Sequence, residues 1–411
     1  MVSQAFVAAV VIACGACRPA GPYLYVWARD ADDKASDFLG VIDASATSPM
    51  YGAIVASIPT GVSGTHPHHT ELEMPANGHL LANGFHVGRT WLFDLTRPLQ
   101  PRILTSFGDV AGYSHPHSFL RLPNGHLLVT FQYRADSSGA PDVPGGMSMA
   151  KEHTTGALVE IDEMGKLVRR GDASDSAIQD RRIYPYSVVT MPSRDRAVST
   201  TTDMDHLDTL ATSQWIQLWR LSDLKMLRSI ALPAGPRGDE NQFTGEARLL
   251  PDGSSIYIHT FNCGLYLVRD VAGPEPRVSL VKTFEGKNCG VPILTSHYWL
   301  QTVPEAHALV AMDITDPEHP REVSRVTVGD DEQPHWIAMD PAGRRVVMNS
   351  AGGGKSNRLF VIDFEPASGT LVLDGRFRDA GSSRPGVNMS GKSWPHGFTG
   401  TALPHGTVFS R

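Results

Sequence analysis

Residues 116–131, PHSFLRLPNGHLLVTF, read as two short strands joined by a turn at Pro123 and Gly125. Hydrophobic and polar residues alternate on both sides of this turn, which is the period of a half-buried antiparallel strand. The same order of strand, proline turn and strand returns along the chain at intervals of 37 to 69 residues. Its turns are centred on Pro75, Pro123, Pro192, Pro251, Pro304 and Pro341. One supersecondary unit that recurs in this way indicates a repeat architecture.

Each unit continues with a second pair of strands. These pairs show the same alternation in residues 91–107, 156–171, 216–232, 264–284, 309–328 and 359–377. Two fragments remain: residues 23–59 resemble the late strands of a unit, and residues 394–409 resemble early strands. Joined together they form a seventh unit, and a ring of sheets closed in this way leaves no exposed edge. We therefore predict an all-β fold, a seven-bladed β-propeller closed by N- and C-terminal strands in one blade, with residues 22–411 as a single domain.

Residues 1–21 have the features of a leader. An apolar run over residues 5–13 is followed by small residues, as in a secretory signal peptide. Cys14 also fits the pattern at which bacterial lipoproteins are cleaved and acylated, so a lipid anchor there is one form of this hypothesis. The predicted location is therefore periplasmic, and an N-terminal tail without a targeting role is the alternative. The apolar run is too short to span a bilayer.

The overall composition narrows the choice of partners. The 411 residues carry a formal charge of −7 without any long basic run, so neither a nucleic acid nor an anionic membrane surface is expected to bind. A small molecule is the expected partner. Cys263 and Cys289 stand alone in the sequence, and one disulfide in an oxidising compartment explains them as well as two buried free thiols do.

Histidines recur at one position of the repeat. His69, His117 and His335 each lie six residues before the proline of their turn. The first strand of a propeller blade lies nearest the axis, so these side chains are predicted to face one another there. His396, which opens the expected C-terminal strand in WPHGF, and His297, next to the same position in the fifth unit, complete the predicted metal ligands. Neutral imidazoles suit copper, iron or zinc, and the absence of ligand cysteines disfavours a structural zinc site.

Other polar residues near this position have less specific predicted roles. His66, His68 and His115 are out of phase with the ligands and are predicted to be additional ligands, proton carriers or hydrogen-bond partners of the ligands. His68 is also a catalytic candidate. Glu71 and Glu246 are predicted to orient a histidine or to act as acid or base. The alternative for Glu71 is a solvated strand edge, and the alternative for any single histidine is a hydrogen-bonded core residue.

Several segments resemble the selenium-binding protein family, whose members include the copper-dependent methanethiol oxidases. Residues 37–59, followed by HPHHTE at residues 66–71, are similar to the family's N-terminal strand pair and its His-His segment. Residues 116–131 and 309–329 resemble its Pro-His strand and its Asp-x-Ser-Asp-Pro blade. The resemblance implies a seven-bladed propeller that binds copper. It also implies oxidation of a small thiol by O₂ to formaldehyde, sulfide and hydrogen peroxide.

Two other functions stay open at this point. Non-haem iron dioxygenases that cleave carotenoids also hold their metal with four axial histidines in a seven-bladed propeller. A periplasmic propeller could instead bind a metal or a ligand without turnover, because this fold hosts many functions. One departure from the family narrows its chemistry here: Gly52 stands where selenium-binding members have a cysteine. Selenium carriage through that thiol is therefore not expected.

Overall fold

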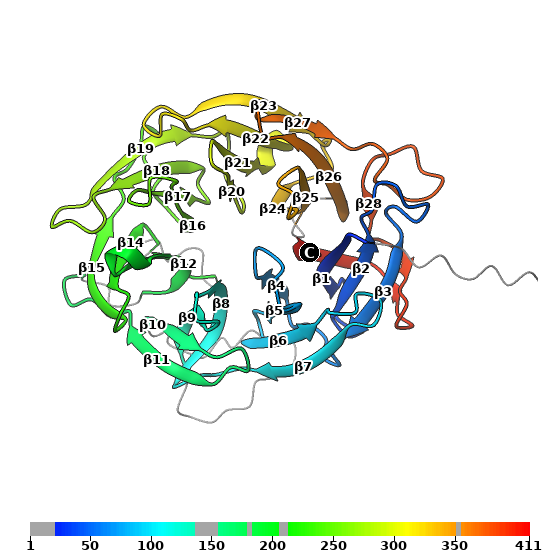
Figure 1. Ribbon diagram of the computed structural model, residues 1–411, viewed down its shortest axis with the longest axis horizontal. Coiled ribbons are helices and arrows are strands. Elements are labelled where there is room, and N and C mark those ends of the chain that lie inside the picture. The colour runs from blue at the N-terminus through cyan, green and yellow to red at the C-terminus, as the bar shows by residue number, and fades with distance from the viewer. Residues whose placement is uncertain (1–20, 136–154, 179–182, 205–212, 351–354) are drawn as a thin grey trace, which may run out of the picture.

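Seven antiparallel sheets surround a central axis in the computed structural model, which describes residues 21–135, 155–178, 183–204, 213–350 and 355–411 (Figure 1). This arrangement confirms the predicted all-β, seven-bladed propeller. Helical structure within these ranges is limited to short 3-10 turns such as Pro192–Arg194 and Pro304–Ala306. The predicted leader, including Cys14, lies outside the described residues except for its last position.

Six blades are meanders of consecutive strands that run outward from the axis (Figure 1). Blade 1 contains β4 (Pro67–Thr70), β5 (His79–Gly84), β6 (Arg89–Asp94) and β7 (Arg102–Phe107). Blade 2 contains β8 (Tyr113–Arg121), β9 (Leu127–Arg134), β10 (Thr155–Ile161) and β11 (Leu167–Asp172). Blade 3 contains β12 (Pro185–Met191), β13 (Arg196–Thr201), β14 (Trp215–Arg220) and β15 (Lys225–Ala231).

The next three blades repeat this order. Blade 4 contains β16 (Thr244–Leu249), β17 (Ile256–Thr260), β18 (Gly264–Arg269) and β19 (Arg277–Thr283). Blade 5 contains β20 (Ile293–Leu294), β21 (Tyr298–Val303), β22 (Ala308–Asp313) and β23 (Arg321–Thr327). Blade 6 contains β24 (Pro334–Met339), β25 (Arg345–Ser350), β26 (Arg358–Glu365) and β27 (Thr370–Leu373), with β28 (Val387–Asn388) paired to β26.

The two ends of the chain share blade 7, as predicted. This blade consists of β1 (Tyr23–Asp30), β2 (Phe38–Asp43), β3 (Ile54–Pro59) and the C-terminal strand β31 (Ala402–Phe409). Strand β31 is innermost and pairs antiparallel with β1, from Leu24 opposite Phe409 to Asp30 opposite Ala402. The Tyr23 N–H also donates to Ser410 Oγ at 2.9 Å. The ring is therefore closed by main-chain hydrogen bonds between the two ends of the described chain.

The sequence-based assignment of blade 5 is wrong by one strand. Pro304 lies in the turn between β21 and β22, the second and third strands, and not after the first strand. The innermost strand, β20, is only two residues long. A strand of that length carries no period-two pattern, so the proline turn that follows β21 was the first signal the sequence could offer.

The innermost strands share a β-bulge. Along β4 three residues separate Pro67 from Thr70, whereas two separate their partners on β5. The same mismatch occurs in β8, β12, β16 and β31, and β24 is irregular at the corresponding point. A bulge bends its strand and re-aims the side chains within it. In this fold it turns one residue of each bulged inner strand toward the axis, whereas the two-residue strand β20 has no bulge.

Side chains of one blade hold the bulged strand of the next. Asn83 on β5 donates to the Pro116 carbonyl at 2.7 Å, and Asn349 on β25 donates to the His405 carbonyl at 2.7 Å. The buried indole of Trp336 donates to the Thr407 carbonyl at 2.8 Å. These bonds satisfy carbonyl groups that the bulges free from the sheet ladders. The axis is thus lined by strands that neighbouring blades fix in place.

Among the described residues, no helix has the length and hydrophobicity needed to cross a membrane.

Candidate metal centre at the propeller axis

The bulge gives six of the seven inner strands one residue at the axis, the exception being β20 of blade 5. Strand pairing assigns this position to His68, His117, Tyr186, Gly245, His335 and His405. His117 and His335 share this position, whereas in blade 1 it belongs to His68, and the predicted ligand His69 is the next residue. The reason is that the stretch from the bulge to the proline is one residue longer in blade 1 than in blade 2. Counting six residues back from Pro75 therefore gives His69, one residue after the axial position.

The imidazoles of four blades meet in a compact cluster. The Nε2 atoms of His68 and His117 lie 3.0 Å apart. One ring nitrogen from each of His68, His69 and His117 lies within 4.8 Å of the others. The His405 ring centroid is 4.3 Å from that of His68 and 5.2 Å from that of His335. Five histidines from blades 1, 2, 6 and 7 are thus in contact through a chain of neighbouring rings.

Hydrogen bonds set the direction of several of these rings. His117 Nδ1 lies 2.8 Å from the Tyr186 carbonyl oxygen, so it donates its proton there and leaves the Nε2 lone pair free. The His69 main-chain N–H donates to Asn83 Oδ1 at 2.6 Å. The Nδ1 atoms of His68 and His405 are buried and find no hydrogen-bond partner among the described residues. Buried polar atoms without a partner are costly and call for an explanation, such as an ion.

Burial keeps the cluster neutral. It lowers the pKa of His117 to about 3 and the pKa of His335 to about 4. It also holds the pKa values of His68, His69 and His405 well below 6.5, and the neighbouring imidazoles reinforce that direction. Since neutral imidazole is the form that binds metal ions, the cluster stays ready to ligate near neutral pH.

Two cavities lie on opposite sides of the cluster. The upper cavity, of about 550 Å³, is lined by residues at or before the bulges, including His66, His68, His335 and His405. The lower cavity, of about 120 Å³, is lined by residues that follow the bulges, including His69 and Glu246. The inner strands all run in the same direction along the axis. The histidines therefore separate a wide chamber from a narrow one.

His69 faces the lower cavity together with a buried polar group. Its Nε2 lies 3.4 Å from the Tyr186 hydroxyl and its Nδ1 lies 3.5 Å from Ser118 Oγ. Glu246, also at this cavity, accepts a hydrogen bond from Arg248 at 2.7 Å through Oε2. The other carboxylate oxygen, Oε1, is buried without a hydrogen-bond partner among the described residues. The predicted acid or base Glu246 therefore lies on the same cavity as a cluster histidine.

Glu71 is placed differently from its prediction. Its carboxylate is buried against Arg121, with 2.7 Å between Oε1 and Nε, and accepts the Leu81 N–H at 3.0 Å. Burial raises its pKa to about 7, which Arg121 opposes. Glu71 lines neither cavity as the described residues outline them. The solvated strand edge weighed as the alternative is also wrong, because the side chain is buried.

A further imidazole reaches the axial layer from a second strand. His259 on β17 is buried, and its Nδ1 accepts the Glu246 N–H at 2.8 Å. Gly245 occupies the axial position of blade 4, and a Cβ atom there would lie 2.3 Å from His259 Cε1. His259 thus fills the place that the missing side chain leaves. Its Nε2 finds no hydrogen-bond partner among the described residues, and burial lowers its pKa to about 3.

The predicted ligand His396 does not lie on the C-terminal inner strand. It lies in the turn of a small hairpin formed by β29 (Lys392–Ser393) and β30 (Thr399–Gly400). Its Nδ1 is 2.7 Å from Ser57 Oγ on β3, the outermost strand of blade 7, and its ring packs on Phe38. The inner strand β31 carries His405 instead. The missed signal was a second Pro-His step, at Pro404, in the same C-terminal fragment.

The predicted ligand His297 is also misplaced. It is exposed in the turn between β20 and β21, because blade 5 was assigned one strand out of phase. Of the other candidates, His66 lines the upper cavity and its Nδ1 lies 2.6 Å from His86 Nε2. His115 Nδ1 lies 3.0 Å from Ser114 Oγ.

Known proteins resemble this chain in sequence and in fold. No family model matches the chain. A methanethiol oxidase from a Hyphomicrobium species is 24% identical to it over 349 residues, which are 80% of this chain and 75% of that protein. A hypothetical selenium-binding protein from Sulfolobus tokodaii superposes with a TM-score of 0.71 and 16% identity, covering 95% of this chain and 94% of that one. The chain is thus similar in sequence to a methanethiol oxidase and similar in fold to a selenium-binding protein.

The fold is also similar to that of an enzyme with a different printed name. A periplasmic gluconolactonase from Pseudomonas aeruginosa has a TM-score of 0.61 and 15% identity, covering 95% of this chain and 99% of that one.

The spacing and the donor atoms of the axial histidines fit a bound transition-metal ion. Two nitrogen ligands that are each about 2 Å from one ion lie about 3 Å apart, which matches the 3.0 Å between His68 Nε2 and His117 Nε2. The donors are imidazole nitrogens, which suit copper, iron and zinc better than calcium or magnesium. The partnerless Nδ1 atom of His405 offers a further donor beside them.

Gly52, at the position where the sequence resemblance implies a cysteine in selenium-binding members, has no room for a side chain. Gly52 has a φ of +84°, a conformation that side chains rarely adopt, and a Cβ atom there would lie 2.9 Å from the Arg378 carbonyl oxygen. The local backbone is therefore built for glycine and not for a thiol-bearing residue.

Proposed function

We propose that this chain is a copper-dependent oxidase that uses O₂ to oxidise a small thiol or a related organosulfur compound. One observation carries the proposal: His68, His69 and His117 bring three buried ring nitrogens within 4.8 Å of one another, with His68 on the upper axial cavity and His69 on the lower one. The similarity to methanethiol oxidase supports the substrate class. The low pKa values that burial gives these histidines support the neutral form that a copper ion requires.

We assign His68 and His117 as the principal ligands because their Nε2 atoms converge and the His117 ring is fixed by the Tyr186 carbonyl. His69 and His405 are the next candidates, and His335 borders the same layer. Bound copper would supply the one-electron chemistry that links thiol oxidation to O₂ reduction. The protein holds the donors in neutral form and excludes bulk water from the floor of the upper cavity.

The overall reaction balances as a two-electron oxidation. A primary thiol, O₂ and water give an aldehyde, hydrogen sulfide and hydrogen peroxide; the C–S bond breaks, and the carbon loses two electrons that O₂ gains. Glu246 is the proposed acid or base, because its Oε1 is buried without a partner on the lower side of the cluster. Tyr186 positions His69 through the 3.4 Å contact of its hydroxyl.

Metal analysis of protein purified without added metal tests the proposal, together with electron paramagnetic resonance. We expect about one copper per chain, O₂ uptake with methanethiol, and formation of hydrogen peroxide and sulfide. Stoichiometric copper without any O₂ uptake in the presence of thiols would reject the oxidase and favour a binding protein. Protein without firmly bound metal would reject every metal-dependent function.

A non-haem iron dioxygenase is the second candidate. The equivalent positions of four inner strands hold His68, His117, His335 and His405, and four axial histidines are the set such enzymes use. Stoichiometric iron in the same metal analysis would favour this function over the copper oxidase.

We further propose that the chain works in the periplasm. The apolar run and small residues near the N-terminus support export, with Cys14 as the lipidation site if an anchor is added. The disulfide between Cys263 and Cys289 supports an oxidising compartment. Fractionation of the producing cells, with N-terminal sequencing of the mature chain, tests both points. Uncleaved protein in the cytoplasm would reject them.

A further inference from the structure

We propose that the upper cavity selects primary thiols with an apolar body about the size of an aromatic ring, and that methanethiol is a poor fit for it. The inference rests on the proposed oxidase function and specifies its substrate. Methanethiol has two heavy atoms, and a water molecule has a share of about 30 Å³ in the liquid. By that measure methanethiol would fill only about a tenth of the 550 Å³ cavity. Cavities of this size hold ligands of many atoms.

The lining of the cavity changes with depth. His68 and His405 are buried at the floor. The aromatic rings of Phe243 and Phe261 are half-buried and form a wall above them. Gln333 also lines the cavity and is exposed. The cavity therefore offers a ligand nitrogen donors at one end, an apolar wall along its length and hydrogen-bonding groups at the solvent end.

The apolar wall begins directly beside the histidines. The Phe261 ring is parallel to the His335 imidazole, with 4° between their planes and 6.3 Å between their centroids. It also meets the Tyr186 ring edge-on, with 5.5 Å between centroids. A substrate whose sulfur approaches the imidazoles must therefore place its next carbon atoms against Phe261. A one-carbon thiol has no further carbons to make that contact.

The backbone of the wall is held in unusual conformations. Phe243 has a φ of +59°, which is rare and strained for a bulky side chain. Cys263 and Asn288 nearby have φ values of +63° and +62°. Such conformations persist only where surrounding structure enforces them, and they are common at ligand-binding sites. We interpret the strain at Phe243 as the consequence of directing its ring into the cavity.

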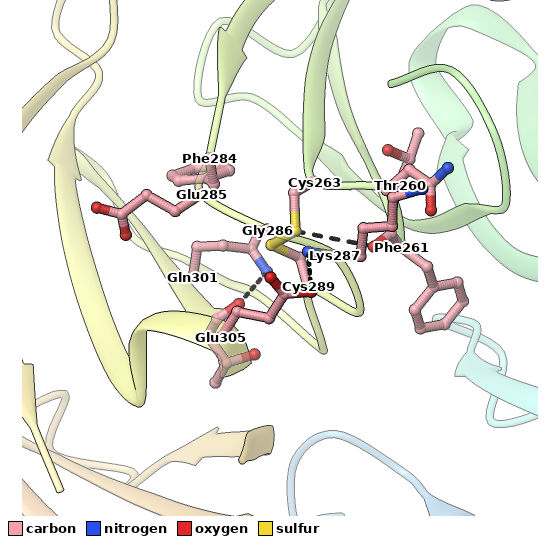
Figure 2. Close-up of a disulfide and its surroundings, with 12 residues drawn as sticks. Thr260, Phe261, Cys263, Phe284, Glu285, Gly286, Lys287, Cys289, Gln301 and Glu305 are labelled. Atoms are coloured by element: carbon pink, nitrogen blue, oxygen red, sulfur yellow. Dashed lines mark hydrogen bonds between the residues drawn. A yellow bond between two sulfur atoms is a disulfide. The ribbon is translucent and has the colours of Figure 1, made fainter. Parts of the chain in front are cut away.

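A disulfide bond lies next to Phe261 in the apolar wall (Figure 2). Cys263, two residues after Phe261, is bonded to Cys289. The Cys289 N–H donates to the Phe261 carbonyl at 3.1 Å, and the Phe261 N–H donates to the Phe243 carbonyl at 2.8 Å. The two aromatic residues are therefore tied to each other and to the segment that enters blade 5. A preformed wall of this kind favours one shape of apolar group over others.

The charge of the residues at the solvent end of the upper cavity indicates the charge of the substrate. Lys287 is the cation among the lining residues, and it is paired with Asp239 at 2.7 Å. Its charge is thus already compensated. Asn262, Asn288 and Gln333 supply neutral amides on the same lining. The cavity therefore suits an uncharged substrate better than a carboxylate or an amine.

Steady-state O₂ uptake by the copper-loaded full chain tests the inference, with methanethiol and phenylmethanethiol as probes. Phenylmethanethiol, O₂ and water would give benzaldehyde, hydrogen sulfide and hydrogen peroxide. We expect kcat/KM to be at least about tenfold higher for phenylmethanethiol, since even one methylene gives about that discrimination in an apolar pocket. Equal or higher kcat/KM for methanethiol would overturn this inference and leave the oxidase function standing. No uptake with either thiol would overturn both.

Variants of Phe261 distinguish a loss of substrate selectivity from a general loss of activity. Phe261→Ala is expected to lower kcat/KM for phenylmethanethiol about tenfold and to change that for methanethiol by less than about twofold. Phe398→Ala removes a half-buried ring on the small outer hairpin and should change neither value. If Phe261→Ala does not fold, Phe261→Leu replaces the ring with a smaller apolar side chain and should shift the preference in the same direction. An equal loss for both thiols in a copper-loaded, folded variant would contradict the inference.

Discussion

At the scale of the residue, Gly245 and His259 share one place at the axis. Because a Cβ atom at position 245 would lie 2.3 Å from His259 Cε1, Gly245→Ala must displace the imidazole or the inner strand. We expect this variant to lose about 1–3 kcal/mol of unfolding free energy, the usual cost of overpacking. Urea denaturation measures the loss.

A matched control isolates the steric effect. Gly375→Ala adds the same methyl group where no atom lies within 4 Å, so its unfolding free energy should change by no more than about 0.5 kcal/mol. In the double variant Gly245→Ala with His259→Ala the clash is absent, and the two costs should not add. Additive costs would show that His259 does not occupy the space beside Gly245.

The metal centre gives a second prediction for single residues. His68→Ala and His117→Ala each remove one of the two Nε2 atoms that lie 3.0 Å apart, so each should weaken copper binding at least about 100-fold. Chelator competition followed by metal analysis measures the affinity. His396→Ala and His297→Ala serve as controls with the same change of side chain, and both should retain copper. Retention of copper by the first pair would place the metal elsewhere.

Some axial residues could be predicted from the sequence and others could not. The spacing to a proline identified His117 and His335, because their turns have the same length. The same spacing selected His69 and not His68, because the stretch from the bulge to Pro75 is one residue longer than its equivalent in blade 2, and this cannot be seen without strand pairing. His405 had a readable signal in its Pro-His step. His259 had none, since it lies on a second strand and reaches the axial layer only because Gly245 has no side chain.

At the scale of the element, the disulfide joins the turn between β17 and β18 to the segment between β19 and β20. It closes a loop with a sequence separation of 26 residues, for which chain entropy predicts a stabilisation of about 3 kcal/mol. The double variant Cys263→Ser with Cys289→Ser should therefore unfold at lower urea concentration than the parent protein. Reductant should lower the parent's stability and leave the variant unchanged. An equal effect of reductant on both proteins would contradict the prediction.

Strands long enough to show alternating hydrophobic and polar residues were predicted correctly. The strands that were assigned wrongly were all very short. The paired strands on either side of Pro75, Pro123, Pro192, Pro251 and Pro341 form as expected, because a proline turn separates two runs of strand-forming residues at each of these places. Strand β20 is too short to show any period, and the hairpin of β29 and β30 was taken for the start of the C-terminal strand. Both errors moved a predicted ligand away from the axis.

At the scale of the whole molecule, the number of blades follows from the repeat, and the closure follows from the two fragments left over at the chain ends. The same closure decides where the metal centre lies. Strand β31 brings His405 next to His68 on β4, with 4.3 Å between ring centroids, although 337 residues separate them in sequence. No local pattern could bring these two residues together. Only the ring as a whole brings them into contact.

This arrangement predicts that copper stabilises the entire ring. The proposed ligands come from blades 1, 2 and 7, so a bound ion links the closing blade to its neighbours and binds only the folded chain. At a free copper concentration of 100 times the Kd, the stabilisation is about 2.7 kcal/mol. We expect thermal unfolding of the copper-loaded protein at a Tm several degrees above that of the chelator-treated protein. The double variant His68→Ala with His117→Ala should show no such shift, because it lacks both converging nitrogens. A shift of the same size in that variant would mean that copper stabilises the chain from a site other than the axis.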